Sequence, residues 1–195
     1  MKKVLIALCG IATIALSTVS CTGPAAEPTA EISKDSLIAK GKYLVTIMGC
    51  NDCHTPFKMG PKGPERDMEN MLSGHPAQMP ISKFDTSTSK NWVLFNTTGT
   101  AISGPWGISF AANLTSDETG IGKWTEAQFK KALREGKFKG LDGNRPIMPP
   151  MPWENYVNMK DEDLKAIFYF LQSTKPVKNI VPDYISPDKL QSYIN

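Results

Sequence analysis

Apolar side chains recur at helical spacing in three stretches of the chain. Residues 33–48 carry one apolar face and begin with Ser33, a favourable N-cap residue. Residues 125–136 begin with the capping-box sequence Thr-Glu-Ala-Gln and end at Gly136. Residues 161–173 have acidic side chains in the first turn and apolar ones at i, i+3, i+4 and i+7. The pattern therefore predicts three helices.

Residues 55–123 lie between the first two of these helices and have no sustained period. They are rich in Gly and Pro, which predicts long loops with one short hairpin around residues 93–108. A loop region of this length is unusual in a compact domain, so we expect it to pack around something.

The N-terminus has the pattern of a secretory signal peptide, which we assign to residues 1–20. Lys2 and Lys3 precede an apolar run over residues 4–16, and this run is too short to span a bilayer. An alternative is a buried N-terminal helix, but the run is apolar on all sides. We therefore expect the mature chain in the periplasm or on the outer face of a bacterial membrane.

The end of this segment resembles a bacterial lipoprotein signal, in which a cysteine becomes the lipidated first residue. Cys21 stands at that position, in Leu-Ser-Thr-Val-Ser-Cys. Residues 21–32 are rich in Pro, Ala and Thr and would form a flexible tether. The alternative is ordinary cleavage near Ala25 or Ala26, which would release a soluble protein.

Composition limits the classes of function. With 195 residues, 41% of them hydrophobic and 21% charged, the chain suits one globular domain rather than a disordered tail or a multi-span membrane protein. The net charge of +3 includes Lys2 and Lys3, and removing these two from the 22 basic residues leaves 20 against 19 acidic ones. A nearly neutral chain without a basic stripe gives no case for nucleic-acid binding.

The most informative motif is Cys50-Asn-Asp-Cys53-His54, the C-x-x-C-H attachment signature of c-type haem. Two thiols three positions apart can form thioethers with the two vinyl groups of one haem, and the adjacent imidazole can then bind the iron as its proximal ligand. The motif predicts one covalently bound haem c.

A redox site and a zinc site are two other interpretations of the motif. A redox C-x-x-C usually begins a helix in a βαβ unit, and no such pattern surrounds it. A zinc site needs four ligands, and after processing only Cys50, Cys53, His54 and His75 are plausible soft donors. Adjacent Cys53 and His54 would share one tetrahedron awkwardly, so haem attachment is favoured.

The sixth ligand of the iron is suggested by the segment Arg-Pro-Ile-Met-Pro-Pro-Met-Pro-Trp at residues 145–153. Its prolines exclude a helix interior and stiffen the backbone. Such a loop could hold the weak thioether ligand of either Met148 or Met151. His75 is a further candidate, although a loop histidine is more often a hydrogen-bonding residue.

The order of these features resembles a class I cytochrome c: a helix, C-x-x-C-H, a long loop, a Pro-rich segment with Met and a C-terminal helix. The closer resemblance, over about residues 36–178, is to the haem domains of cytochrome c subunits in bacterial periplasmic alcohol and sugar-acid dehydrogenases. It rests on these segments: Gly41-Lys-Tyr-Leu-Val45, Cys53-His-Thr-Pro56, Asn113-Leu-Thr-Ser-Asp117, Thr119-Gly-Ile-Gly-Lys-Trp124, Met151-Pro-Trp153 and Asp161-Glu-Asp-Leu164.

This resemblance implies an all-α class I cytochrome c fold with a long loop insertion and, within it, a short hairpin. Its first and last helices would cross around a covalent haem, and Gly41 would let Phe168 or Tyr169 approach closely. The mono-haem domain would cover residues 33–179 and be followed by a C-terminal tail, residues 180–195.

The resemblance also implies roles for single residues. The distal ligand would be the Met of the Met-Pro-aromatic segment, which means Met151 rather than Met148. A proline carbonyl, of Pro61 or Pro64, would accept a hydrogen bond from His54 Nδ1–H. The residues expected to hydrogen-bond to the haem propionates are Arg145, Trp153 and Tyr156.

These features predict an electron-transfer protein rather than an enzyme, acting as a one-electron carrier or electron-entry domain. Its partners would be redox proteins, with a dehydrogenase as donor and an oxidase or another acceptor, and a lipidated Cys21 would attach it to a membrane. Two alternatives stay open: a haem protein with an open iron site, such as a peroxidase or gas sensor, and a fixed subunit of a dehydrogenase complex.

Overall fold

The computed structural model describes residues 32–194. The predicted signal peptide (1–20), nearly all of the tether (21–32) and the lipidation of Cys21 therefore lie outside the described residues. Within the described part of the chain, none of the helices has the length and apolar character needed to cross a membrane.

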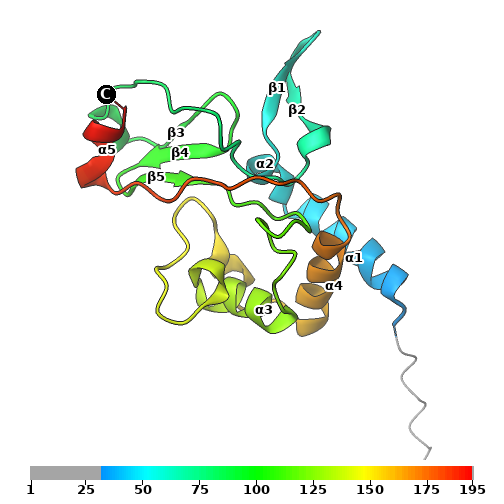
Figure 1. The fold of residues 1–195 in the computed structure, drawn as a ribbon. Helices are drawn as coiled ribbons and strands as arrows, with labels where there is room; N and C mark the ends of the chain where they lie inside the picture. Colours follow the sequence, from blue (N-terminus) through cyan, green and yellow to red (C-terminus); the bar gives the residue numbers. More distant parts are fainter. Residues whose placement is uncertain (1–31, 195) are drawn as a thin grey trace, which may run out of the picture. The chain divides into compact units, whose positions relative to one another are not determined.

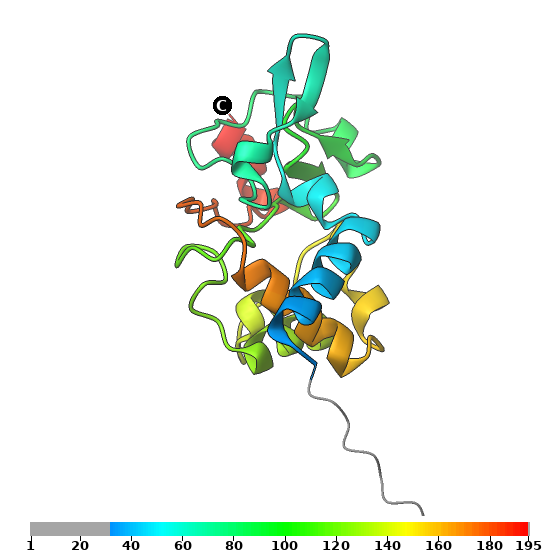
Figure 2. The same ribbon diagram turned by 90° about the vertical axis from the view of Figure 1, so that its right-hand side faces the viewer.

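Helices α1 (Lys34–Ile47) and α4 (Asp161–Gln172) pack against each other and cross in Figure 2. The predicted cap is confirmed, since the Ser33 side chain accepts a hydrogen bond from the Ser36 amide at 3.2 Å. Gly41 allows the contact: a Cβ atom there would lie 2.0 Å from the Ala166 carbonyl oxygen and 2.7 Å from Phe170 Cβ. The nearest atoms thus belong to Ala166 and Phe170 rather than to Phe168 or Tyr169 as expected.

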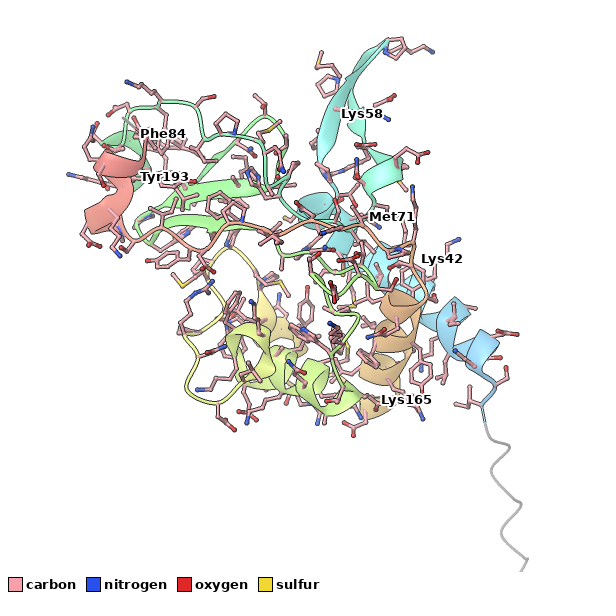
Figure 3. All side chains as sticks on the ribbon, in the orientation of Figure 1. Lys42, Lys58, Met71, Phe84, Lys165 and Tyr193 are labelled. Carbon is pink, nitrogen blue, oxygen red and sulfur yellow. The ribbon has the colours of Figure 1, made fainter. Side chains whose placement is uncertain are left out.

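Helix α3 (Glu126–Glu135) completes the main hydrophobic core. Thr125 Oγ1 accepts from the Gln128 amide at 3.1 Å, and Gly136 ends the helix in the left-handed conformation, as the sequence predicts. Met71, labelled in Figure 3, packs against this core. Its buried members are Val45, Leu72, Ile121, Phe129, Leu164, Ile167, Phe168, Phe170 and Leu171.

The prediction of an all-α fold is wrong, because the chain contains two small antiparallel sheets (Figure 1). One is the hairpin of β1 (Phe57–Gly60) and β2 (Gly63–Arg66). The other has the strand order β3-β4-β5, formed by β3 (Leu94–Phe95), β4 (Ala101–Gly104) and β5 (Gly107–Phe110). The hairpin expected around residues 93–108 matches β4–β5, whereas β1–β2 was missed.

Both hairpins turn through the same sequence, Gly-Pro-x-Gly, at residues 60–63 and 104–107. Proline presets the backbone at the second turn position, and the last glycine has a positive φ, +116° at Gly63 and +102° at Gly107. The repeated turn was the available sequence signal for the missed hairpin. With only two to four residues a strand, neither sheet produces a detectable alternation of apolar positions.

Residues 180–194 are not the tail that the sequence suggested. The chain runs from α4 back across the molecule to α5 (Pro187–Ile194), as Figure 1 shows. On the way Ile185 forms an isolated antiparallel bridge with Ile108 of β5. A second hydrophobic core results, made of Ala101, Ile108, Ile185, Leu190 and Ile194.

The remaining elements are short. Helix α2 (Cys50–His54) follows α1, and four single turns of 3₁₀ helix lie in the loops: η1 (Met68–Asn70), η2 (Thr88–Lys90), η3 (Phe138–Gly140) and η4 (Trp153–Tyr156).

Candidate functional site

The C-x-x-C-H motif folds as the one-turn helix α2. Gly49, with φ at +69°, separates it from α1 and changes the direction of the chain. Side chains three and four positions apart share one face of a helix. Helix α2 therefore presents Cys50, Cys53 and His54 on the same side.

Cys50 and Cys53 are half-buried free thiols in the described part of the chain. Burial raises the pKa of Cys50 to about 11, with a smaller contribution from the charge of Asp52. Burial also raises the pKa of Cys53. Both groups are thus neutral thiols near pH 7, whereas the nucleophilic cysteine of a redox C-x-x-C has a lowered pKa.

The imidazole of His54 is fixed by a hydrogen bond to the main chain. Its Nδ1–H donates to the Ala112 carbonyl oxygen at 2.7 Å, since a carbonyl can only accept. Burial lowers the pKa of His54, so the ring is neutral and Nε2 keeps its lone pair. The expectation that Pro61 or Pro64 would be the acceptor is wrong, because Nδ1–H is bonded to Ala112 instead. Pro61 lies in the turn of the β1–β2 hairpin and Pro64 in β2.

His75 has partners at both ring nitrogens. It is fully buried, its Nδ1 lies 2.9 Å from Thr100 Oγ1, and its Nε2 lies 3.3 Å from the Met79 carbonyl oxygen. The ring also packs against Phe110, with centroids 4.9 Å apart. His75 is therefore a structural, hydrogen-bonding residue. Across residues 32–194, no three His, Cys, Asp or Glu side chains come together to hold a metal ion.

The segment with the two candidate methionines is attached at several points. The Ile147 amide donates to the Gly136 carbonyl at 2.7 Å, and Ser109 of β5 donates to the Pro149 carbonyl at 2.5 Å. At its end, Trp153 lies so close to Gly136 that a Cβ atom there would be 2.4 Å from the indole ring. Met148 and Met151 are both half-buried on this fixed loop.

The three predicted propionate residues are not alike in their surroundings. Tyr156, at the end of η4, lies near the motif: burial raises its pKa, and the two cysteines add to that effect. Arg145 stacks on Phe138, with its guanidinium carbon 3.8 Å from the ring centroid, and burial lowers its pKa. Trp153 packs on Gly136 as described above.

Two neighbours of the motif were missed by sequence reasoning. Arg66 donates to the Thr55 carbonyl at 2.9 Å and stacks on Phe57 at 3.9 Å, which binds the β1–β2 hairpin to the end of α2. Gly74 donates its amide to the His54 carbonyl at 2.8 Å and has φ at +77°. Nothing in the local sequence indicates which loop residues return to a motif.

Comparison with known proteins agrees with the predicted resemblance. No protein-family model matches the chain. The fructose dehydrogenase cytochrome subunit of Gluconobacter japonicus is 31% identical over 153 residues, which is 77% of this chain and 24% of that protein. This chain is homologous to cytochrome c subunits of bacterial dehydrogenases. The expected resemblance is thereby confirmed.

Two more of these homologues cover most of the chain. The cytochrome c subunit of the quinone alcohol dehydrogenase of Gluconobacter oxydans (strain 621H) is 29% identical over 162 residues, 81% of this chain and 26% of the subunit. The gluconate 2-dehydrogenase cytochrome c subunit of Pantoea cypripedii is 29% identical over 147 residues, 74% of this chain and 25% of the subunit. The chain thus spans about a quarter of the length of these cytochrome c subunits.

Homology to cytochrome c subunits implies haem c, and the side chains of α2 fit that group. Covalent attachment consumes two thiols on one face, and Cys50 and Cys53 are unpaired there. A proximal histidine binds iron through one ring nitrogen and donates a hydrogen bond from the other. His54 Nδ1–H donates to the Ala112 carbonyl oxygen, which leaves Nε2 for the iron.

Proposed function

We propose that this chain binds one haem c covalently and transfers single electrons outside the cytoplasm. Cys50 and Cys53 would form the thioethers, and His54 Nε2 would be the proximal iron ligand. The observation that carries the proposal is the geometry of α2, where the two thiols share a face with an imidazole already oriented by Ala112.

Met151 is proposed as the distal ligand, with Met148 as the alternative. The attachment of their loop to Gly136, at the end of α3, and to β5 supports this role, because a weak neutral ligand must be held at a fixed place. Arg145, Trp153 and Tyr156 are proposed to hydrogen-bond to the propionates. When bound, the haem supplies an iron that alternates between two charges one electron apart.

The protein's own part is to hold and shield rather than to catalyse. His54 keeps its proton on Nδ1 through Ala112, and the main core packs against Cys50 and excludes water from that side. The proposed partners are a dehydrogenase as donor and an oxidase or other protein as acceptor, with lipidated Cys21 as a membrane attachment. A fixed place within a dehydrogenase complex is a second form of the same function, favoured by relatives that are themselves named as subunits.

Optical spectra of the purified holoprotein test this proposal. We expect a sulfur-to-iron band in the oxidised form, lost in Met151→Ala and kept in Met148→Ala, and no spectral change when carbon monoxide is added to the reduced wild type. Loss of the band in Met148→Ala alone would assign the distal position to Met148. A carbon monoxide shift in the wild type would instead indicate an open iron site and overturn the carrier proposal.

A further inference from the structure

The Ala112 carbonyl belongs to a stretch of chain that is paired on both sides of it. The His75 amide donates to the Ala111 carbonyl at 2.9 Å, and the Leu114 amide donates to the Leu72 carbonyl at 2.8 Å. The acceptor of His54 is thus held against residues 72–75, even though it lies 58 residues from the histidine along the chain.

Gly74 makes this close approach possible. A Cβ atom on Gly74 would lie 2.4 Å from the Ala111 carbonyl oxygen and 2.7 Å from the Ala112 carbonyl oxygen. Real Cβ atoms do not come this near to backbone atoms, and the φ of +77° also favours glycine. The position of the Ala112 carbonyl therefore depends on how residues 72–75 and 111–115 are held together.

Two asparagines connect residues 72–75 and 111–115 to a third segment, residues 177–179. Asn113 is buried, and its Nδ2 donates to the Val177 carbonyl at 2.8 Å while its Oδ1 accepts from the Thr115 amide at 3.0 Å. Asn179 Nδ2 donates to the Ser73 carbonyl at 2.7 Å and to the His75 carbonyl at 2.8 Å.

The two residues also share a partner, which Asn113 reaches through its side chain and Asn179 through its main chain. Thr119 Oγ1 accepts from the main-chain N–H of Asn179 at 2.9 Å and from Asn113 Nδ2 at 3.1 Å. Asn179 Oδ1 accepts from the Ala77 amide at 2.9 Å. Asn113 therefore ties the segment that carries the acceptor to residues 177–179, and Asn179 ties residues 177–179 to the segment that faces it.

We propose that Asn113 and Asn179 are positioning residues for the proximal ligand: by fixing the Ala112 carbonyl, they set the orientation of the His54 ring and its strength as an electron donor. This inference rests on the proposed function, because it concerns His54 as an iron ligand. Neither asparagine needs to touch the haem.

The physical effect has a definite direction. A hydrogen bond from Nδ1–H to a fixed carbonyl makes Nε2 more basic, and a more basic ligand stabilises the oxidised iron more than the reduced iron. Loosening the acceptor weakens that preference. The midpoint potential of the haem should then move to more positive values.

The test compares holoprotein variants by redox titration and by the paramagnetically shifted NMR signals of the oxidised haem. Asn113→Ala and Asn179→Ala should each shift the potential positively and move the signals of the proximal imidazole. The matched control is Gln172→Ala, which removes a half-buried side-chain amide that also donates to a distant carbonyl, that of Ile121, at 2.7 Å. The control should leave both readouts unchanged.

The inference is overturned if both asparagine variants keep the wild-type potential and signals, or if Gln172→Ala shifts them equally. If neither asparagine variant yields folded holoprotein, Thr119→Val removes the shared hydroxyl at constant volume, and an unchanged potential there has the same meaning. A wild type without a histidine-ligated haem c spectrum would refute the proposed function itself, whereas a normal wild type with unresponsive variants would refute the inference alone.

Discussion

The two histidines of the chain differ in whether a ring nitrogen is left for an iron ligand bond. His54 donates from Nδ1 to the Ala112 carbonyl and, within residues 32–194, its Nε2 makes no hydrogen bond, whereas both ring nitrogens of His75 have partners, Thr100 and Met79. Their residue type is the same, so the assignment of one as a ligand candidate and the other as a structural residue rests on these hydrogen bonds.

His75 should make stability depend on pH. Burial lowers its pKa below the ordinary 6.5, so the unfolded chain takes up a proton at a higher pH than the folded protein does. The free energy of unfolding should therefore fall as pH drops from about 6.5 through the lower pKa of the folded state, by at most about 1.4 kcal/mol per pH unit. Denaturant titrations of the holoprotein between pH 7.5 and 5 measure this slope.

The control for this prediction is His75→Gln, which keeps hydrogen-bonding groups but does not titrate. Its unfolding free energy should decline less over the same interval. An equal decline in the variant would show that other groups cause the pH dependence.

Among the elements, those defined by local signals were predictable and those defined by distant contacts were not. Ser33, Thr125 and Gly136 mark helix ends within a few residues of themselves, and the structure confirms all three. The strands contain two to four residues each and are defined by their partners, so no period in the sequence reveals them. The acceptor of His54 was mispredicted for the same reason, since Ala112 is far away along the chain.

The contact of α1 with α4 depends on the missing side chain of Gly41. Gly41→Ala should lower the unfolding free energy by about 2 kcal/mol through overpacking against Ala166, although Ala favours a helix by about 1 kcal/mol. Lys42→Ala, an exposed change on the same helix (Figure 3), should stay within about 0.5 kcal/mol. A stabilised Gly41→Ala protein in thermal or denaturant unfolding would contradict the close packing of the two helices.

At the scale of the whole described chain, two separate hydrophobic cores stabilise the fold. The main core joins α1, α3 and α4, and the second joins β4 and β5 to α5. Since α5 comes from the far end of the chain, the small sheet is completed only when residues 185–194 return to it.

The second core should therefore be weakened selectively from α5. Leu190→Ala should cost about 2 kcal/mol or more, because a buried leucine is truncated. Hydrogen exchange should accelerate in β4 and β5 while the amides of α1 and α4 keep their protection. Tyr193→Ala, at a side chain that is 49% exposed and labelled in Figure 3, is the control and should change little. Equal loss of protection everywhere would mean that the two cores unfold together.

The distance along the chain between His54 and Ala112 also has a kinetic consequence. The five residues of helix α2 are consecutive, but its imidazole gains an acceptor only after a loop of 58 residues has closed. Contacts between residues far apart in sequence form late and slowly, because loop-closure entropy opposes them. We therefore expect the thiols of Cys50 and Cys53, which are close in sequence, to be available before the ring of His54 reaches its final orientation.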